Sequence, residues 1–261
     1  MKLEIFQVDA FTNKVFGGNP AAVCPLEEWL SDDVMQRIAM ENAVAETAFF
    51  VMKKEGVEIR WFTPEIEMDL CGHATLAAAH VMTKHLGYTG SRIEFDSKSG
   101  KLSVRLDEKY IHLNFPSRKP VIHQAPQAVL DSFHIAPIEV LKSRDYVLVF
   151  ESEEQIKSLQ PDTKFLDQIN LDPGGVIVTA KGDNVDFVSR FFTPQASILE
   201  DQVTGSAHCS LIPYWAEKLS KYEMTAMQLS SRSGTLFCRN EGDRVQISGE
   251  AITYMVGTIL L

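Results

Sequence analysis

Four polar residues in this chain of 261 residues stand where their side chains could move a proton, namely Glu46, His73, Asp201 and Ser206. Glu46 opens an apolar run, and an apolar setting raises the pKa of a carboxyl group into the range that acid-base catalysis uses. His73 follows Gly72 at a predicted helix start, where the positive end of the helix dipole is expected to keep the imidazole neutral near pH 7. A carboxyl group and a neutral imidazole together suit a proton relay.

The other two residues lie at a second predicted helix start. Asp201 comes shortly before Gly205 and could orient a histidine or bind a substrate amine, although the neighbouring Glu200 competes for either role. Ser206 could cap the helix with its hydroxyl or offer the hydroxyl to a ligand. Each residue also has an ordinary structural interpretation: a strand-end carboxylate, a core or capping histidine, or an acid that interacts with the helix dipole.

An internal repeat places the two helix starts at matching points of the chain. Residues 60–64 read Arg-Trp-Phe-Thr-Pro, and residues 190–194 read Arg-Phe-Phe-Thr-Pro. Each copy then leads through an acidic residue to a glycine: through Asp69 to Gly72-His73-Ala74, and through Asp201 to Gly205-Ser206-Ala207. Five matched positions, a matched acid and a matched glycine in one order indicate an internal duplication.

The same elements are expected to precede both copies. Residues 46–52 and 57–62 are rich in β-branched and aromatic residues and flank the polar turn 53–56. Residues 176–180 and 185–192 flank a second polar turn in the same way. Such runs around a glycine-containing turn are the signal of a β-hairpin. The repeated unit is therefore hairpin, loop and helix.

A buried helix is expected to follow each loop. From His73 the chain is apolar on most faces until Gly87, which predicts a core helix with a glycine stop. Its counterpart, residues 206–220, is also largely apolar but contains Pro213, which should kink this helix or shorten its regular part.

The duplication predicts two domains. Residues 1–117 form the first domain and residues 118–250 the second. Residues 115–120 contain prolines and charged residues and are expected to link the two domains. The final run, residues 251–261, has the composition of a strand and is expected to join the first domain.

The two helix starts that open with glycine are predicted to bind an anion. The first turn of a helix presents unpaired N–H groups and the positive end of the dipole, and glycine lets a ligand approach the backbone closely. We therefore expect a substrate carboxylate to bind at the backbone of Gly72, Ala74, Gly205 and Ala207. The alternative is that both glycines only form tight turns into core helices.

Net charge, motifs and cysteine usage indicate which partners and cofactors to expect. The net charge of -10 disfavours nucleic acid and membranes as partners, because both select basic surfaces. The spacing of His73, His80 and His85 is not the i, i+4 pair of metal-binding helices, and no Walker A or G-x-G-x-x-G motif occurs, so we expect no metal and no cofactor. Four scattered cysteines, without a signal-peptide or membrane-spanning run, predict a cytoplasmic protein.

As a set, several segments resemble the PhzF family of phenazine-biosynthesis-like proteins. They span nearly the whole chain in the family's order: Phe6-Gln7-Val8-Asp9-Ala10-Phe11, Gly17-Gly18-Asn19-Pro20-Ala21, Ala45-Glu46-Thr47-Ala48-Phe49, Phe62-Thr63-Pro64, Asp69-Leu70-Cys71-Gly72-His73-Ala74-Thr75 and Glu200-Asp201-Gln202-Val203-Thr204-Gly205-Ser206-Ala207. The resemblance implies an α+β fold of the diaminopimelate epimerase-like type. In that duplicated fold, two similar domains each wrap a curved, mostly antiparallel sheet around a central helix, with the active site between them.

The resemblance also implies a chemistry. In the phenazine enzyme of this family, a glutamate acts as acid and base and moves a proton on a cyclic dihydro-hydroxyanthranilate without a cofactor. By motif, Glu46 takes that role, with His73, Asp201 and Ser206 as the supporting polar residues. The family also implies a homodimer.

The sequence therefore favours a cofactor-independent isomerase that moves a proton on a small carboxylated substrate, cyclic or amino-acid-like. One alternative is a non-catalytic protein that uses the same cleft to bind a metabolite or to meet a protein partner. Another is an amino-acid racemase or epimerase that uses Cys71. The related epimerases take a cysteine from each half, whereas Thr204 holds the matching position of the second half here.

Overall fold

The chain divides into two compact units in the computed structural model, which describes residues 1–54, 56–171, 174–194 and 198–261. Unit 1 comprises Met1–Asn114 together with Ile247–Leu261, and unit 2 comprises Phe115–Gln246. The boundary expected between residues 117 and 118 falls just inside unit 2. One residue of the predicted turn 53–56, Glu55, lies outside the described residues.

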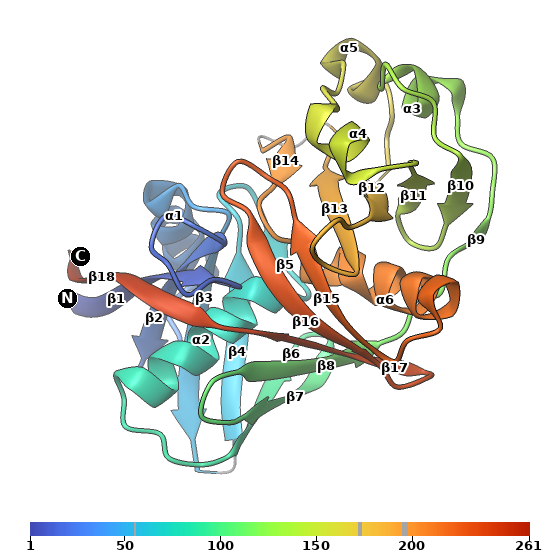
Figure 1. Cartoon of the computed structure of the whole chain (residues 1–261). Coiled ribbons are helices and arrows are strands. Elements are labelled where there is room, and N and C mark those ends of the chain that lie inside the picture. Colours follow the sequence, from blue (N-terminus) through green and yellow to red (C-terminus); the bar gives the residue numbers. More distant parts are fainter. Residues whose placement is uncertain (55, 172–173, 195–197) are drawn as a thin grey trace. The chain divides into compact units, whose positions relative to one another are not determined.

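Unit 1 combines helices with a sheet of long strands (Figure 1). Its elements in chain order are β1 (Lys2–Ala10), β2 (Asn19–Leu26), α1 (Asp32–Asn42), β3 (Glu46–Lys53), β4 (Gly56–Phe62), β5 (Glu67–Met68), α2 (Gly72–Lys84), β6 (Arg92–Ser97), β7 (Gly100–Leu106), β8 (Ile111–Pro116) and β18 (Ala251–Leu260). Strands β8 and β17 (Arg244–Gly249) carry the chain across the boundary between the units.

The C-terminal strand belongs to the sheet of unit 1. β18 pairs antiparallel with β1, from Lys2 opposite Leu260 to Ala10 opposite Ala251, and runs beside it in Figure 1. On its other side β1 pairs antiparallel with β2, and β2 pairs in parallel with β3. The sheet continues through the predicted hairpin β3–β4 and the antiparallel run β6–β7–β8, with β4 and β6 parallel. The final residues of the chain thus fold with the first.

α2 is the buried helix of unit 1. Every residue from His73 to Met82 is buried, and the helix contacts β1, β2, β3 and β18. Its alanine-rich sequence explains this position, because small apolar side chains allow strands to pack closely on several faces. The helix ends at Lys84, and Gly87 then takes a positive φ of 70°, which confirms the predicted glycine stop.

Unit 2 repeats this plan with additional short helices. Its elements are β9 (Val121–Ile122), α3 (Gln127–Asp131), β10 (Glu139–Lys142), β11 (Tyr146–Val149), α4 (Glu153–Ser158), α5 (Thr163–Leu166), β12 (Val176–Lys181), β13 (Phe187–Phe192), β14 (Glu200–Asp201), α6 (Gly205–Leu219), β15 (Glu223–Gln228) and β16 (Gly234–Asn240). The predicted hairpin β12–β13 is antiparallel, while β11–β12 and β13–β15 are parallel pairs. A core that includes Leu148, Phe150 and Phe192 lies under these strands.

α6 is the central helix of unit 2, and Pro213 does not shorten it. The helix runs from Gly205 to Leu219 with Pro213 inside, so of the two predicted effects the shortening is wrong, while the kink stays a prediction. Proline lacks the N–H that would bond to the carbonyl four residues earlier, at Cys209. That carbonyl instead accepts a 2.9 Å hydrogen bond from the N–H of Arg118, so the proline leaves no unpaired acceptor there. Within the described part of the chain, no helix has the length and apolar character needed to span a membrane.

Each half of the chain fixes its Arg-aromatic-Phe-Thr-Pro segment with the same kind of ion pair. Arg60 binds the two carboxylate oxygens of Glu67 at 2.7 and 2.8 Å. Arg190 binds those of Glu200 at 2.7 and 2.9 Å. In each half the acid lies opposite the last phenylalanine of the preceding strand, Phe62 or Phe192. The duplication therefore extends to side-chain contacts.

Glu67 and Glu200 are thus the matched acids of the repeat, and the predicted match of Asp69 with Asp201 is wrong. Asp201 takes the pairing position in β14 that Met68 takes in β5. The loop between the proline and the matched acid is longer in the second half, so counting residues from the two prolines does not align Glu67 with Glu200. Asp201 is therefore an acid without an acidic counterpart in unit 1.

The two central helices each carry a buried histidine that should make the protein sensitive to acid. Burial lowers the pKa of His80 in α2, and of His208 in α6, to about 4. A histidine of the unfolded chain titrates near 6.5, so between this pH and 4 the unfolded state binds more protons than the folded state. The contribution to stability is fully present above pH 6.5 and falls as the pH drops through this window, by about 3 kcal/mol per histidine.

Urea unfolding at a series of pH values checks this expectation. From about pH 7 to pH 4, His208→Gln should lose about 3 kcal/mol less stability than the wild type. His134→Gln, at an exposed position, should lose as much as the wild type. A pH dependence that is the same in His208→Gln and the wild type would contradict the assignment.

Candidate active site

Glu46 and His73 meet inside unit 1. Glu46 is the first residue of β3, and 16% of its side-chain surface is exposed. His73 is the second residue of α2 and is 4% exposed. The first strand of the hairpin and the start of the following helix place these two side chains together, with Nε2 of His73 2.9 Å from Oε2 of Glu46.

Two further side chains contact the other ring nitrogen of His73. The Asn19 amide nitrogen lies 3.2 Å from Nδ1, and Sγ of Cys71 lies 3.6 Å from it. The imidazole therefore stands between a carboxylate on one side and an amide and a thiol on the other. Nε2 and Oε2 are close enough for an ion pair, yet neither has an aligned hydrogen-bond partner in the part of the chain that the structure describes. Buried polar atoms in this state are rare in native proteins, and a catalytic role is one reason for them.

The surroundings of His73 favour its protonated form. Burial acts to lower the pKa of His73, but the Cys71 sulfur and the Glu46 carboxylate together hold that pKa well above its ordinary value. Burial raises the pKa of the Cys71 thiol, and Glu46 raises it further. The Glu46 carboxylate faces Nε2 of His73. The prediction of a neutral imidazole is wrong, because the adjacent Cys71 sulfur and the carboxylate at 2.9 Å raise the pKa of His73.

The same three side chains are close enough together to hold a metal ion. Glu46, Cys71 and His73 each offer one donor atom, and these atoms lie within 4.8 Å of one another. Metal ligands must converge on one point. Here the carboxylate and the sulfur face opposite nitrogens of the imidazole, which suits proton transfer through the ring better than coordination. The absence of a metal remains a prediction.

Both central helices begin without a side-chain cap. Cys71 and Thr204 hold the N-cap positions before Gly72 and Gly205, and neither side chain makes a capping hydrogen bond. The Cys71 sulfur contacts His73 instead, and the Thr204 hydroxyl contacts Asp201. The N-cap side chains therefore do not compete with a ligand carboxylate for the N–H groups of the first turn.

Ser206 lies inside the first turn of α6, and the capping alternative for it is wrong because Thr204 is the N-cap residue. The Oγ atom of Ser206 accepts a 3.1 Å hydrogen bond from Nη2 of Arg144. Arg144 is held in turn by Asp145, whose buried carboxylate also accepts from the N–H of Gly175 at 2.9 Å. An arginine, one third of it exposed, thus lies next to the start of α6.

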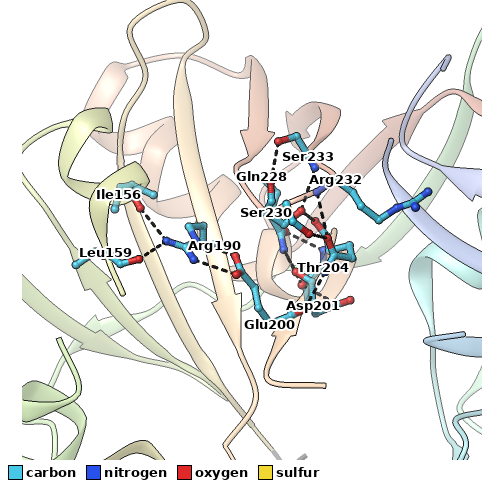
Figure 2. Close-up of polar contacts among 12 residues, drawn as sticks. Ile156, Leu159, Arg190, Glu200, Asp201, Thr204, Gln228, Ser230, Arg232 and Ser233 are labelled. Carbon is cyan, nitrogen blue, oxygen red and sulfur yellow. Dashed lines mark hydrogen bonds and ion pairs between the residues drawn. The ribbon is translucent and has the colours of Figure 1, made fainter. Parts of the chain in front are cut away.

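Asp201 and Glu200 have separate partners in unit 2, as Figure 2 shows. The carboxylate of Glu200 is bound by Arg190, which also donates to the carbonyls of Ile156 and Leu159. Asp201 accepts through Oδ2 a 2.6 Å hydrogen bond from the hydroxyl of Thr204. Glu200 therefore serves the fold, and Asp201 is the carboxylate held beside the start of α6.

Sequence reasoning missed three polar residues at these points. Asn19 lies in the Gly-Gly-Asn-Pro segment of the family motif, a signal that could have assigned it a role. Arg144 precedes β11, and Gln228 ends β15 with its side chain fully buried. No local motif marks either residue, because only strand pairing between distant segments brings them to α6.

The chain is similar to known proteins along its whole length. The family described as phenazine biosynthesis-like protein matches residues 8–257. An uncharacterized isomerase of Pseudomonas aeruginosa is 49% identical, and the match covers 100% of both chains. A solved structure of a PhzF-family phenazine biosynthesis protein from Enterococcus faecalis has a TM-score of 0.96 and 44% identity, again over 100% of both chains.

More distant solved structures share the fold alone. A hydroxyproline epimerase from Agrobacterium vitis, with trans-4-hydroxy-L-proline bound, has a TM-score of 0.61 at 6% identity and is matched over 92% of its length by 99% of this chain. The α+β fold of the diaminopimelate epimerase-like type, expected from the sequence, is confirmed.

Proposed function

We propose, since the chain belongs to the family of phenazine biosynthesis-like proteins, that it is an isomerase that moves a proton on a small carboxylated substrate. The observation that carries this proposal is the pair formed by half-buried Glu46 and buried His73, whose Oε2 and Nε2 atoms lie 2.9 Å apart. Carboxylates and imidazoles with perturbed ionisation concentrate at catalytic sites, where they exchange protons with substrate.

Glu46 acts in this proposal first as base and then as acid. Its carboxylate, paired with the imidazolium of His73, takes a proton from a substrate carbon. The electron pair of the broken C–H bond moves into the conjugated system of the substrate, and Glu46 returns the proton to a second carbon. One C–H bond breaks and one forms, so the reaction needs no oxidant, reductant or cofactor.

The substrate carboxylate is proposed to bind the first turn of a central helix. The N–H groups at Gly72 and Ala74 in unit 1, or at Gly205 and Ala207 in unit 2, would donate to it, because the N-cap side chains make no bond there. In a chain with a net charge of -10, such local donors are what an anionic substrate requires. Asp201 and Ser206 are the supporting polar residues in unit 2.

Proton exchange with solvent tests this function. The protein is incubated in D₂O, with EDTA present, together with small carboxylated compounds that include a cyclic dihydro-hydroxyanthranilate and trans-4-hydroxy-L-proline. Mass spectrometry should detect enzyme-dependent deuterium at a carbon of at least one compound, at a rate that EDTA does not change. A compound that raises the melting temperature but never exchanges would favour the non-catalytic binding protein.

Cys71 gives a reason to test a second function, because its sulfur lies 3.6 Å from Nδ1 of His73. A racemase that used this thiol as its base would lose its activity without it. We expect Cys71→Ala to keep its exchange rate within about threefold of the wild type, because burial raises the pKa of this thiol and so disfavours the thiolate that would react. The control is Cys209→Ala, which removes a buried thiol of α6. A loss of about 100-fold in Cys71→Ala alone would assign the proton transfer to the thiol.

A further inference from the structure

Gln228, Thr204 and Asp201 form one hydrogen-bonded network at the start of α6 (Figure 2). Gln228 is fully buried, and Thr204 is 6% exposed. The Thr204 hydroxyl lies 2.6 Å from Oδ2 of Asp201 and 3.1 Å from Nε2 of Gln228. The Gln228 side chain also reaches two backbone groups: its Oε1 accepts from the N–H of Thr204 at 2.8 Å, and its Nε2 donates to the carbonyl of Asp201 at 2.8 Å.

The backbone fixes the orientation of the Gln228 amide in this network. An N–H only donates, so the side-chain atom of Gln228 that faces the N–H of Thr204 is the amide oxygen. A carbonyl only accepts, so the atom that faces the carbonyl of Asp201 is the amide nitrogen. This nitrogen also donates to the oxygen of Thr204, and the Thr204 hydroxyl donates to Oδ2 of Asp201.

We propose that Gln228 and Thr204 are positioning residues that hold Asp201 as an ionised hydrogen-bond acceptor for the substrate. A separation of 2.6 Å is typical of an O–H group that donates to a charged carboxylate. A bond donated to a carboxylate stabilises the ionised form over the acid. Asp201 would then recognise an N–H or O–H group of the substrate. That last role rests on the proposed isomerase function, whereas the ionised state of Asp201 does not.

Unit 1 shows the same use of the N-cap position. Cys71 and Thr204 both occupy the residue before a central helix, and neither caps it. Each instead directs its side chain to a titratable group in its own unit, Cys71 to His73 and Thr204 to Asp201. In both units, the residue that would ordinarily cap the helix supports an ionisable neighbour.

A direct titration of Asp201 tests the proposal without any substrate. Full-length protein labelled with ¹³C at the aspartate carboxyl groups is titrated by NMR, and the Asp201 signal is identified by its loss in Asp201→Asn. In Thr204→Val, which keeps the shape and removes the hydroxyl, Asp201 should titrate about one pH unit higher than in the wild type. In Thr204→Ser, which keeps the hydroxyl, it should titrate as in the wild type. An Asp201 titration that is unchanged in folded Thr204→Val would overturn the proposal.

The exchange assay separates this inference from the proposed function. If a compound exchanges, the acid limb of the pH–rate profile should move upward by about one unit in Thr204→Val and stay in place in Thr204→Ser. If Thr204 served folding alone, Thr204→Val would lower the melting temperature without moving the acid limb of the pH–rate profile. That result would overturn the inference. If no compound exchanges while Asp201 still shifts in the titration, the proposed function fails and the ionised state of Asp201 stands.

Discussion

Glu46→Gln is expected to slow deuterium exchange by about 10²- to 10⁴-fold, the usual contribution of a general acid-base group. The amide is nearly the same size as the carboxylate but cannot accept a proton from carbon. Substrate binding should persist, because the proposed anchor is the backbone at the helix starts and not Glu46. Exchange is measured by mass spectrometry and binding by calorimetry with the same compound.

Glu4→Gln is the matched control, since Glu4 is an exposed strand glutamate of the same unit. It should exchange at the wild-type rate. Glu46→Gln should also lower the pKa of His73, because the imidazolium loses its facing anion. If Glu46→Gln exchanged deuterium at the wild-type rate, Glu46 would not be the acid-base group.

Arg190→Met is expected to destabilise unit 2 by about 3 kcal/mol, the cost of breaking a buried ion pair from one side. The Arg190 side chain is 12% exposed and Glu200 is 22% exposed. Besides the two bonds to Glu200, the guanidinium donates to the carbonyls of Ile156 and Leu159 and lies 5.0 Å from the ring of Phe192. Its removal leaves a carboxylate and two carbonyls without these donors, and urea unfolding measures the loss.

Arg239→Met provides the comparison for Arg190. Arg239 lies 3.8 and 4.0 Å from two carboxylates, and its side chain is 53% exposed. Exposed pairs of this kind contribute less than about 1 kcal/mol, so this variant should unfold near the wild-type urea concentration. The double variant Arg190→Met, Glu200→Gln should recover part of the loss, because no charge is left unpaired. Equal losses in Arg190→Met and Arg239→Met would show that the buried pair contributes no more than a surface pair.

The local signals in the sequence predicted most of the elements around the site. Hairpins β3–β4 and β12–β13, and helices α2 and α6, follow from apolar runs, turn residues and glycines, all of which act over a few residues. The predicted shortening of α6 at Pro213 is wrong for the same reason. The N–H that satisfies the Cys209 carbonyl comes from Arg118, a residue far away in the sequence.

The errors at the site have a similar physical origin. The predicted match of Asp69 with Asp201 is wrong because the loops after the two prolines differ in length, whereas strand pairing and the equal spacing before Gly72 and Gly205 both align Glu67 with Glu200. The ionisation of His73 depends on a distance of 2.9 Å to Glu46, which spacing along the chain does not determine. Gln228 had no motif at all. Residue type indicated which groups could react, but their partners came from contacts between remote segments.

The pairing of β18 with β1 has a consequence for the order in which the chain folds as it is synthesised. Unit 1 needs both β1 and β18, whereas unit 2 lies between these two strands in the sequence. On the ribosome, unit 2 can complete its sheet while unit 1 still lacks its last strand. Unit 1 therefore starts to be synthesised before unit 2 but is completed after it, and Glu46 and His73 reach their completed surroundings only after β18 emerges.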